Sequence, residues 1–430
     1  MAVRCVRWSA RVFFSLSVCL LLATTGAWAQ KHASSVNKLA FLGTQRLTSG
    51  VSRDALPPGF LLSGDRDEDV SFEIPGVSGN NSPARIRAAG VPTPAGNPIG
   101  TGVFFALPGL TQFDQAVAFT GSANGFNGQL EPPDQGLAVG NGLVVEAINN
   151  AIAFYLSKGR FKGTLLFPPL AMNVLYGVAP TFTLDAAGKV VSHGPFLSDP
   201  RVYYDSINGF FFVTETETDV DPATGALGPD SHIFIAVIKN DLSTVSVFSL
   251  DVTNDGDAVF GACPCFGDEP LIGADANGFY ISTNAFNTAQ RTFRGEQLYA
   301  ISLSALETGP PGSIVATHFG DLTQSGEPAF SIQPATVPPG GAFEAGQGGT
   351  EYMVSTFHNV LDNRLTVWAL TNTSSLNTAS PSLMLLSTVV DSEKATAFHR
   401  PRTKNLVRLH SSTSSRRLRV RSAHSRITWN

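Results

Sequence analysis

A phrase that recurs every 65 to 69 residues constrains the fold of this chain most strongly. Its copies begin at Asp134, Asp199 and Asp268, and each copy opens an apolar run that ends in a turn built on Gly, Asn or Asp. A second run of aromatic and β-branched residues follows each turn, which is the pattern of a β-hairpin. A hairpin that recurs at a regular spacing predicts a repeat architecture.

Each copy continues past its hairpin with two more strand-like runs, and a fourth copy begins near Ser331. Four antiparallel strands per repeat are typical of a propeller blade. We therefore predict an all-β fold, a β-propeller of about four recognisable four-stranded blades over residues 101–394. A β-sandwich is the alternative, but it does not explain why the same phrase opens every repeat. We expect one short helical turn after the run Ser302–Leu306.

The first 29 residues have the pattern of a secretory signal peptide. Three arginines precede an apolar run over residues 12–23, and Ala27, Trp28 and Ala29 form a small-residue cleavage site. Cleavage before Gln30 predicts a secreted or periplasmic protein, and an uncleaved membrane anchor is the alternative. No later stretch is long and apolar enough for a transmembrane helix, so we expect no membrane span after cleavage.

Two further segments differ from the repeats in composition. Residues 30–100 are rich in Ser, Gly, Pro and Asn without hydrophobic periodicity, which predicts a poorly structured, low-complexity leader. Residues 395–430 carry nine basic residues and no acid, which is typical of a disordered basic tail. A shifted reading frame that removes native blades is the other interpretation. The abrupt change in mid-domain favours it, and it predicts an incomplete ring.

The charge of the chain limits the classes of partner, and its cysteines predict a disulfide. Removing the signal and the basic tail leaves 17 Lys and Arg against 34 Asp and Glu, and such an acidic body argues against nucleic acid as a partner. It suits a cation or a neutral ligand. Cys263 and Cys265 are the cysteines outside the signal, and an oxidising compartment favours a disulfide between them over free thiols or a metal site.

The phrases that start at Glu131, Ser198 and Cys263 resemble a group of exported bacterial β-propeller proteins of unknown function. The resemblance extends over residues 102–390. The chain is more distantly similar to the sialidase-like propellers with Asp-box turns, although it lacks the Asp-box spacing of Ser, Asp, Gly and Trp. These resemblances imply a propeller fold and an exported location, and they imply no particular activity.

Acids at the start of the repeats are the candidate catalytic residues, namely Asp134, Asp199, Asp268 and Glu269. In a propeller the inner strands line a central channel, and two carboxylates roughly 5 to 10 Å apart are what glycoside cleavage needs. The alternative interpretation is structural, because an Asp at the same point of every repeat often caps a turn or a strand start.

An acidic loop is the candidate metal site. Asp251, Asp255 and Asp257 lie around a Gly turn, and such oxygen clusters suit calcium, although the complete EF-hand pattern is absent. Asp219 and Asp221 form a second acidic loop. A solvated acidic loop without metal is the alternative.

These observations favour a binding protein over an enzyme. We predict a binding or scaffold protein for an extracellular glycan or protein, with a propeller-type glycoside hydrolase as the alternative. The few arginines of the body argue against sialidase chemistry, and there is no G-x-S-x-G motif for a serine nucleophile.

Overall fold

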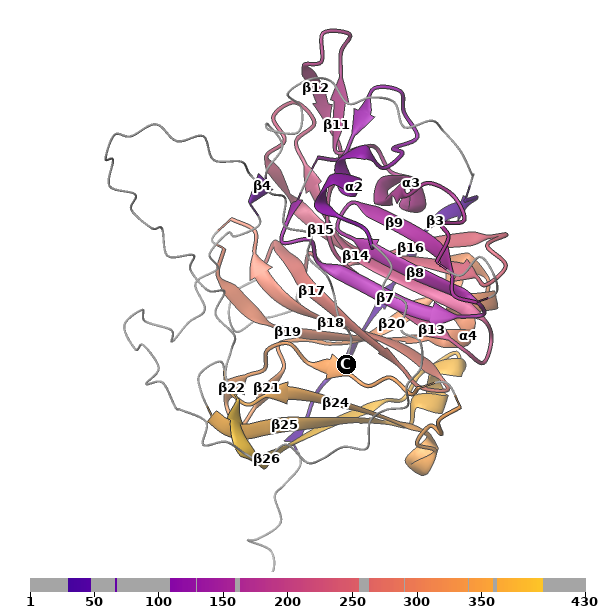
Figure 1. Ribbon diagram of the computed structural model, residues 1–430. Coiled ribbons are helices and arrows are strands. Elements are labelled where there is room, and N and C mark those ends of the chain that lie inside the picture. Colours follow the sequence, from indigo (N-terminus) through magenta and orange to yellow (C-terminus); the bar gives the residue numbers. More distant parts are fainter. Residues whose placement is uncertain are drawn as a thin grey trace, which may run out of the picture. The chain divides into compact units, whose positions relative to one another are not determined.

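The computed structural model describes residues 30–47, 66–67, 109–128, 130–158, 163–254, 263–289, 291–338, 340–358 and 362–396. The predicted signal peptide and almost all of the basic tail lie outside these residues. In the described part of the chain, β-strands dominate (Figure 1), and no helix there is long and apolar enough to cross a membrane.

The strands form four antiparallel meanders in chain order, which confirms the predicted all-β fold with four blades. Blade 1 contains β7 (Gln135–Gly140), β8 (Leu143–Ile148), β9 (Ala151–Leu156) and β10 (Leu170–Ala171). Blade 2 contains β13 (Phe196–Asp205), β14 (Phe210–Val220), β15 (Leu227–Lys239) and β16 (Val245–Asp251). Blade 3 contains β17 (Cys265–Ala274), β18 (Gly278–Asn287), β19 (Phe293–Ser302) and β20 (Val315–Phe319). Blade 4 contains β23 (Gln333–Pro334), β24 (Thr350–Thr356), β25 (Asp362–Thr371) and β26 (Met384–Thr396).

The chain forms two compact units, one with blades 1 and 2 and the other with blades 3 and 4. The core of the first unit contains Val145 and Phe154 of blade 1 together with Val213 and Phe234 of blade 2. The core of the second unit contains Tyr280 and Leu298 of blade 3 together with residues of blade 4, among them Met353, Trp368, Leu370 and Leu385. In each unit, therefore, two blades bury apolar residues in one common core.

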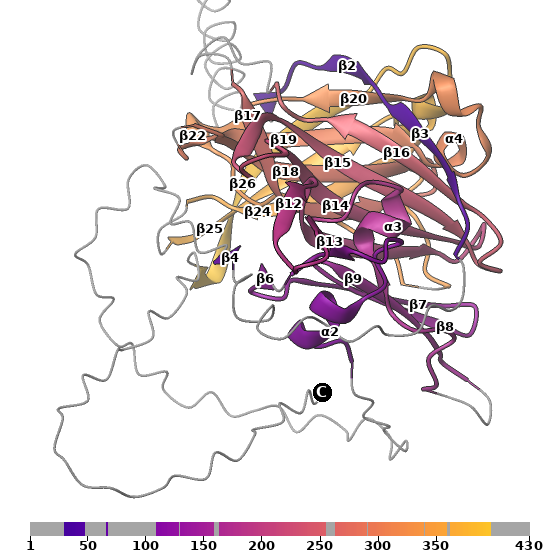
Figure 2. The ribbon, with the colours of Figure 1, turned by 90° about the horizontal axis from the view of Figure 1, so that it is seen from above.

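The N-terminal segment corrects one prediction. Residues 30–45 are not a poorly structured leader, because they form β1 (Gln30–Lys31), β2 (Ser35–Lys38) and β3 (Ala40–Gln45). These strands pair with β26, β20 and β16, and Figure 2 shows β2 beside β20. Backbone hydrogen bonds hold these strands in place. The side chains of β2 and β3 are mostly exposed, so the sequence shows no alternation of apolar and polar residues there.

Polar side chains add to the pairing of these edge strands. His32 Nε2 lies 2.9 Å from Ser387 Oγ of β26. Ser35 Oγ lies 3.4 Å from Nδ1 of His318, whose ring stacks on Tyr299. Burial lowers the pKa of His318 to about 4, so the ring is neutral at physiological pH.

Short elements complete the described chain. The helices are α2 (Gln112–Val117), α3 (Met172–Tyr176) and α4 (Leu303–Thr308), and the 3₁₀ turns are η2 (Pro311–Ser313), η3 (Gly346–Gly348) and η4 (Thr373–Asn377). Helix α4 is the predicted helical turn, and Ser302 caps it by accepting a hydrogen bond from the amide of Ala305. The remaining strands are β4 (Arg66–Asp67), β5 (Gly125–Phe126), β6 (Leu130–Glu131), β11 (Phe182–Leu184), β12 (Val190–His193), β21 (Thr323–Gln324) and β22 (Glu327–Pro328).

Neighbouring blades within a unit approach through small residues of the inner strand. A Cβ atom added to Gly136 of β7 would lie 2.8 Å from the Val202 amide nitrogen, and one added to Gly140 would collide with the Tyr204 ring. Gly273 of β17 lies in the same way against Pro334 and Ala335 at the start of blade 4. The face of each inner strand that carries these glycines therefore packs on the next blade.

Blade 4 has a buried and an open face. Met353, Trp368 and Leu385 point into the core. Side chains alternate along a strand, and cross-strand partners share a face. The register therefore places the residues that alternate with these three on the opposite side of the sheet. We call this surface the open face of blade 4, and it consists of Tyr352, Val354, Thr356, Leu365, Val367, Ala369, Leu386, Thr388 and Val390.

Candidate functional site

Two of the acids that open the repeats, Asp199 and Glu269, lie at backbone irregularities. Asp199 has a φ of 57° and Glu269 has a φ of 44°, and a proline follows each of them. The pairing register shifts at both places, between Ser198 and Arg201 and between Asp268 and Leu271. Ser331, just before blade 4, also has a left-handed φ of 51°. In blades 2 and 3 the repeated phrase thus encodes a β-bulge at the start of the inner strand.

A buried asparagine from the preceding blade holds this bulge. Asn149 Oδ1 accepts a hydrogen bond of 3.0 Å from the amide of Asp199, and its Nδ2 donates to the Pro132 carbonyl at 2.7 Å. Asn284 of blade 3 repeats the contact, because its Oδ1 accepts from the Ser331 amide at 3.0 Å. The same kind of side chain therefore links blade 1 to blade 2 and blade 3 to blade 4.

The four predicted catalytic acids belong to different compact units and differ in burial. Asp199 is buried, with its Oδ2 3.4 Å from Ser198 Oγ. Asp134 and Asp268 are half-buried, and Glu269 is exposed. Asp134 and Asp199 belong to one compact unit, whereas Asp268 and Glu269 belong to the other. The bulge and the asparagine contact support the structural interpretation of Asp199.

A second set of repeated aspartates caps the inner hairpins. The Asp205 carboxylate accepts from the amides of Ile207 and Asn208. Asp275 Oδ1 accepts from the amides of Asn277 and Gly278, as expected for an Asx turn. The turn signal was visible in the sequence as Asp followed by Asn-Gly, but these carboxylates were not assigned a role there.

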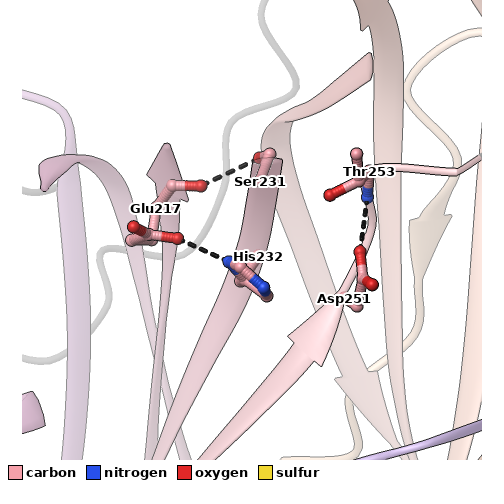
Figure 3. A network of polar contacts seen from close by, with 5 residues as sticks. All are labelled: Glu217, Ser231, His232, Asp251 and Thr253. Carbon is pink, nitrogen blue, oxygen red and sulfur yellow. Dashed lines mark hydrogen bonds and ion pairs between the residues drawn. The ribbon is translucent and has the colours of Figure 1, made fainter. Parts of the chain in front are cut away.

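Blade 2 brings together a carboxyl group and an imidazole that the sequence did not single out. Glu217 lies on β14 and His232 on β15, and the two residues are direct partners in the antiparallel ladder. Figure 3 shows Glu217 Oε2 and His232 Nδ1 pointing toward one another, at 2.7 Å. Glu217 is buried, whereas the His232 side chain is 28% exposed.

The environment of Glu217 tunes its protonation. Burial raises the pKa of Glu217 to about 7, the contact with His232 opposes this rise, and the nearby Asp219 carboxyl reinforces it. Such a carboxyl group exchanges its proton near neutral pH, which suits either hydrogen bonding to a ligand or general acid catalysis. Glu217 could have been singled out from the sequence as an acid within an otherwise buried strand.

Two other buried carboxyl groups lie in the unit of blades 3 and 4. Glu296 accepts from the amides of Ser331 and Ile332 at 2.8 and 2.9 Å, and burial raises its pKa to about 7. Burial and the neighbouring Asp275 raise the pKa of Glu351 to about 9. Both side chains are almost inaccessible to solvent.

The predicted calcium loop is described at its first residue only. Asp251 is exposed, and its Oδ1 accepts from the Thr253 amide at 2.9 Å (Figure 3). Asp255 and Asp257 lie outside the described residues. Among the residues that the structure describes, no three His, Cys, Asp or Glu side chains are grouped as metal ligands. Cys263 and Cys265 are joined as a disulfide, as predicted.

Comparisons with known proteins give distant matches. No protein-family model matches this chain, and neither does any curated protein. An exo-beta-1,3-galactanase from Phanerochaete chrysosporium, solved with beta-1,3-galactotriose, is 10% identical, and the match covers 60% of this chain and 49% of that chain with a TM-score of 0.27. The chain thus spans about half of the galactanase chain.

Two further solved structures are similar at the same level. A GH43_1 enzyme from Xanthomonas citri complexed with xylose is 10% identical, with coverage of 60% of this chain and 73% of that chain and a TM-score of 0.25. A neuraminidase-like protein of A/flat-faced bat/Peru is 12% identical, with coverage of 61% and 62% and a TM-score of 0.25. We therefore base the function of this chain on its own residues.

Proposed function

We propose that this chain is an exported β-propeller protein that binds an extracellular glycan on blade 2, at His232 and its partner Glu217. The observation that carries the proposal is the contact between Glu217 and His232. The strand pairing fixes both side chains, and the partly exposed imidazole presents polar atoms at the surface. A rigid pair of hydrogen-bonding groups is suited to an uncharged ligand rich in hydroxyl groups.

The charge of the chain supports a neutral ligand. The region between the predicted signal and the basic tail is strongly acidic, and Asp219 lies beside the Glu217 carboxyl. A polyanionic ligand would be repelled by this surface. A protein ligand is the other outcome that the binding experiment distinguishes.

Glycoside hydrolysis is the second candidate function, and the protonation of Glu217 favours it. A carboxyl group with a pKa of about 7 retains its proton near neutral pH and suits the role of a general acid. The second carboxyl group would be Asp219 in this case, or one of the inner-strand acids. Retaining and inverting mechanisms both require such a pair.

A glycan array combined with a panel of glycosidase substrates tests both functions. We expect glycan binding that Glu217→Gln and His232→Asn weaken and that Asp241→Asn does not change. Asp241 is a suitable control because it is an exposed acid beside the far end of β15. Turnover that Glu217→Gln abolishes would support the hydrolase instead, and binding to proteins but no glycan would contradict the choice of ligand.

A further inference from the structure

Two blade surfaces of this chain carry apolar side chains that are exposed to solvent. On the open face of blade 4, Tyr352 is 50% exposed and Val354 is 41% exposed. On β7 of blade 1, Leu137 is 44% exposed and Val139 is 55% exposed. The solvated face of an antiparallel sheet is normally polar, so exposed apolar residues of this kind mark a surface that packs on another protein.

The open face of blade 4 is mostly apolar. None of the nine residues that form it is charged. A hollow of about 340 Å³ lies there, and its lining is apolar, as at Pro334, Tyr352, Val354 and Val367, except for Gln333. A hollow with these walls is suited to receive apolar side chains of a partner.

The exposed side of β7 corresponds to the side of β13 through which blade 2 packs on blade 1. The glycines of β7 face blade 2, so Leu137 and Val139 point to the opposite side. Counted back from the hairpin turn, Leu137 and Val139 correspond to Val202 and Tyr204 of β13. Val202 and Tyr204 are the residues through which blade 2 packs against blade 1. Leu137 and Val139 therefore occupy the positions that receive a preceding blade.

We propose that a second copy of this chain supplies the missing contact. The open face of blade 4 in one copy packs against Leu137 and Val139 of blade 1 in the next copy. This head-to-tail contact repeats between two chains the kind of blade packing that each unit makes within one chain. It differs from an isologous dimer, in which the same face would meet itself.

Sedimentation and light scattering over a range of concentrations test the proposal on the full chain. We expect wild type to form assemblies of two or more copies. Leu137→Lys and Val354→Lys should each raise the dissociation constant about tenfold or more, because each places a charge in an apolar contact. Ile207→Lys is the matched control, since Ile207 is an exposed apolar residue in the β13–β14 turn and belongs to neither surface. Circular dichroism confirms that the variants fold.

Mixing the two weakened variants separates head-to-tail from isologous association. Each variant retains one intact surface, and together they reconstitute one wild-type contact, so the mixture should associate more strongly than either variant alone. A monomeric wild type would overturn the proposal. Loss of association in Val354→Lys with no effect of Leu137→Lys and no rescue on mixing would also overturn it, in favour of an isologous contact.

Discussion

Single buried carboxyl groups give this protein a pH dependence whose sign can be derived. The folded-state pKa of Glu351 is about 9, above the ordinary value of 4.5, because burial and Asp275 disfavour the charged form. The folded state therefore binds this proton more tightly than the unfolded state does. The contribution of Glu351 to stability is complete below about pH 4.5 and is lost as the pH rises toward 9.

Replacing Glu351 with Gln should remove this loss. The amide resembles the neutral acid and carries no charge at any pH, so wild type and Glu351→Gln should have similar unfolding free energies at pH 5. At pH 9 the variant should be the more stable by several kcal/mol, since the pKa of Glu351 rises from 4.5 to about 9 and one pKa unit corresponds to about 1.4 kcal/mol. Urea denaturation at both pH values measures the difference, and equal losses of stability in the two proteins would contradict the assignment.

His232 should influence the titration of Glu217 in a defined direction. The imidazole lowers the pKa of Glu217 against the effect of burial. His232→Asn therefore should raise the pKa of Glu217 above its value of about 7. Carbon-detected NMR of the Glu217 carboxyl group follows the titration directly, and a pKa that stays the same or falls would show that the imidazole does not stabilise the carboxylate.

At the scale of the elements, the joint between neighbouring blades depends on one asparagine. Asn149→Ala would leave the buried amide of Asp199 without its hydrogen-bond acceptor. Asn284→Ala removes one of two acceptors of the Ser331 amide, which also donates to Glu296. We expect Asn149→Ala to lose about 1–3 kcal/mol of unfolding free energy and Asn284→Ala to lose less. Asn208→Ala, at an exposed turn position, should change stability by less than about 0.5 kcal/mol.

The sequence predicted the elements well where a repeat was present. The hairpin phrases near Asp134, Asp199 and Asp268 lie at the inner strands, and the last copy begins at Ser331, beside β23. Strands β1 to β3 were missed because edge strands depend on backbone hydrogen bonds and carry few buried side chains. The contact between Glu217 and His232 was missed because it joins adjacent strands, and a cross-strand pair becomes visible only when the register is known.

At the scale of the whole molecule, we propose that the repeated acids Asp199 and Glu269 serve the fold. The phrase that suggested catalysis places Asp199 and Glu269 in left-handed conformations at β-bulges. The functional residues of our account lie elsewhere, on the second and third strands of blade 2. The composition predicted an acidic protein with a cation or a neutral ligand, but it gave no means to choose among its many carboxyl groups.

Calorimetric titration with the oligosaccharide that binds best on the array tests this account most directly. The proteins to compare are wild type, Glu217→Gln and the inner-strand variants Asp134→Asn and Asp268→Asn. We predict that Glu217→Gln weakens binding about tenfold, because it removes the carboxyl group that orients the partly exposed His232 imidazole, while the inner-strand variants bind as wild type does. Full affinity in Glu217→Gln, or loss of binding in Asp134→Asn and Asp268→Asn, would contradict the assignment of the site to blade 2.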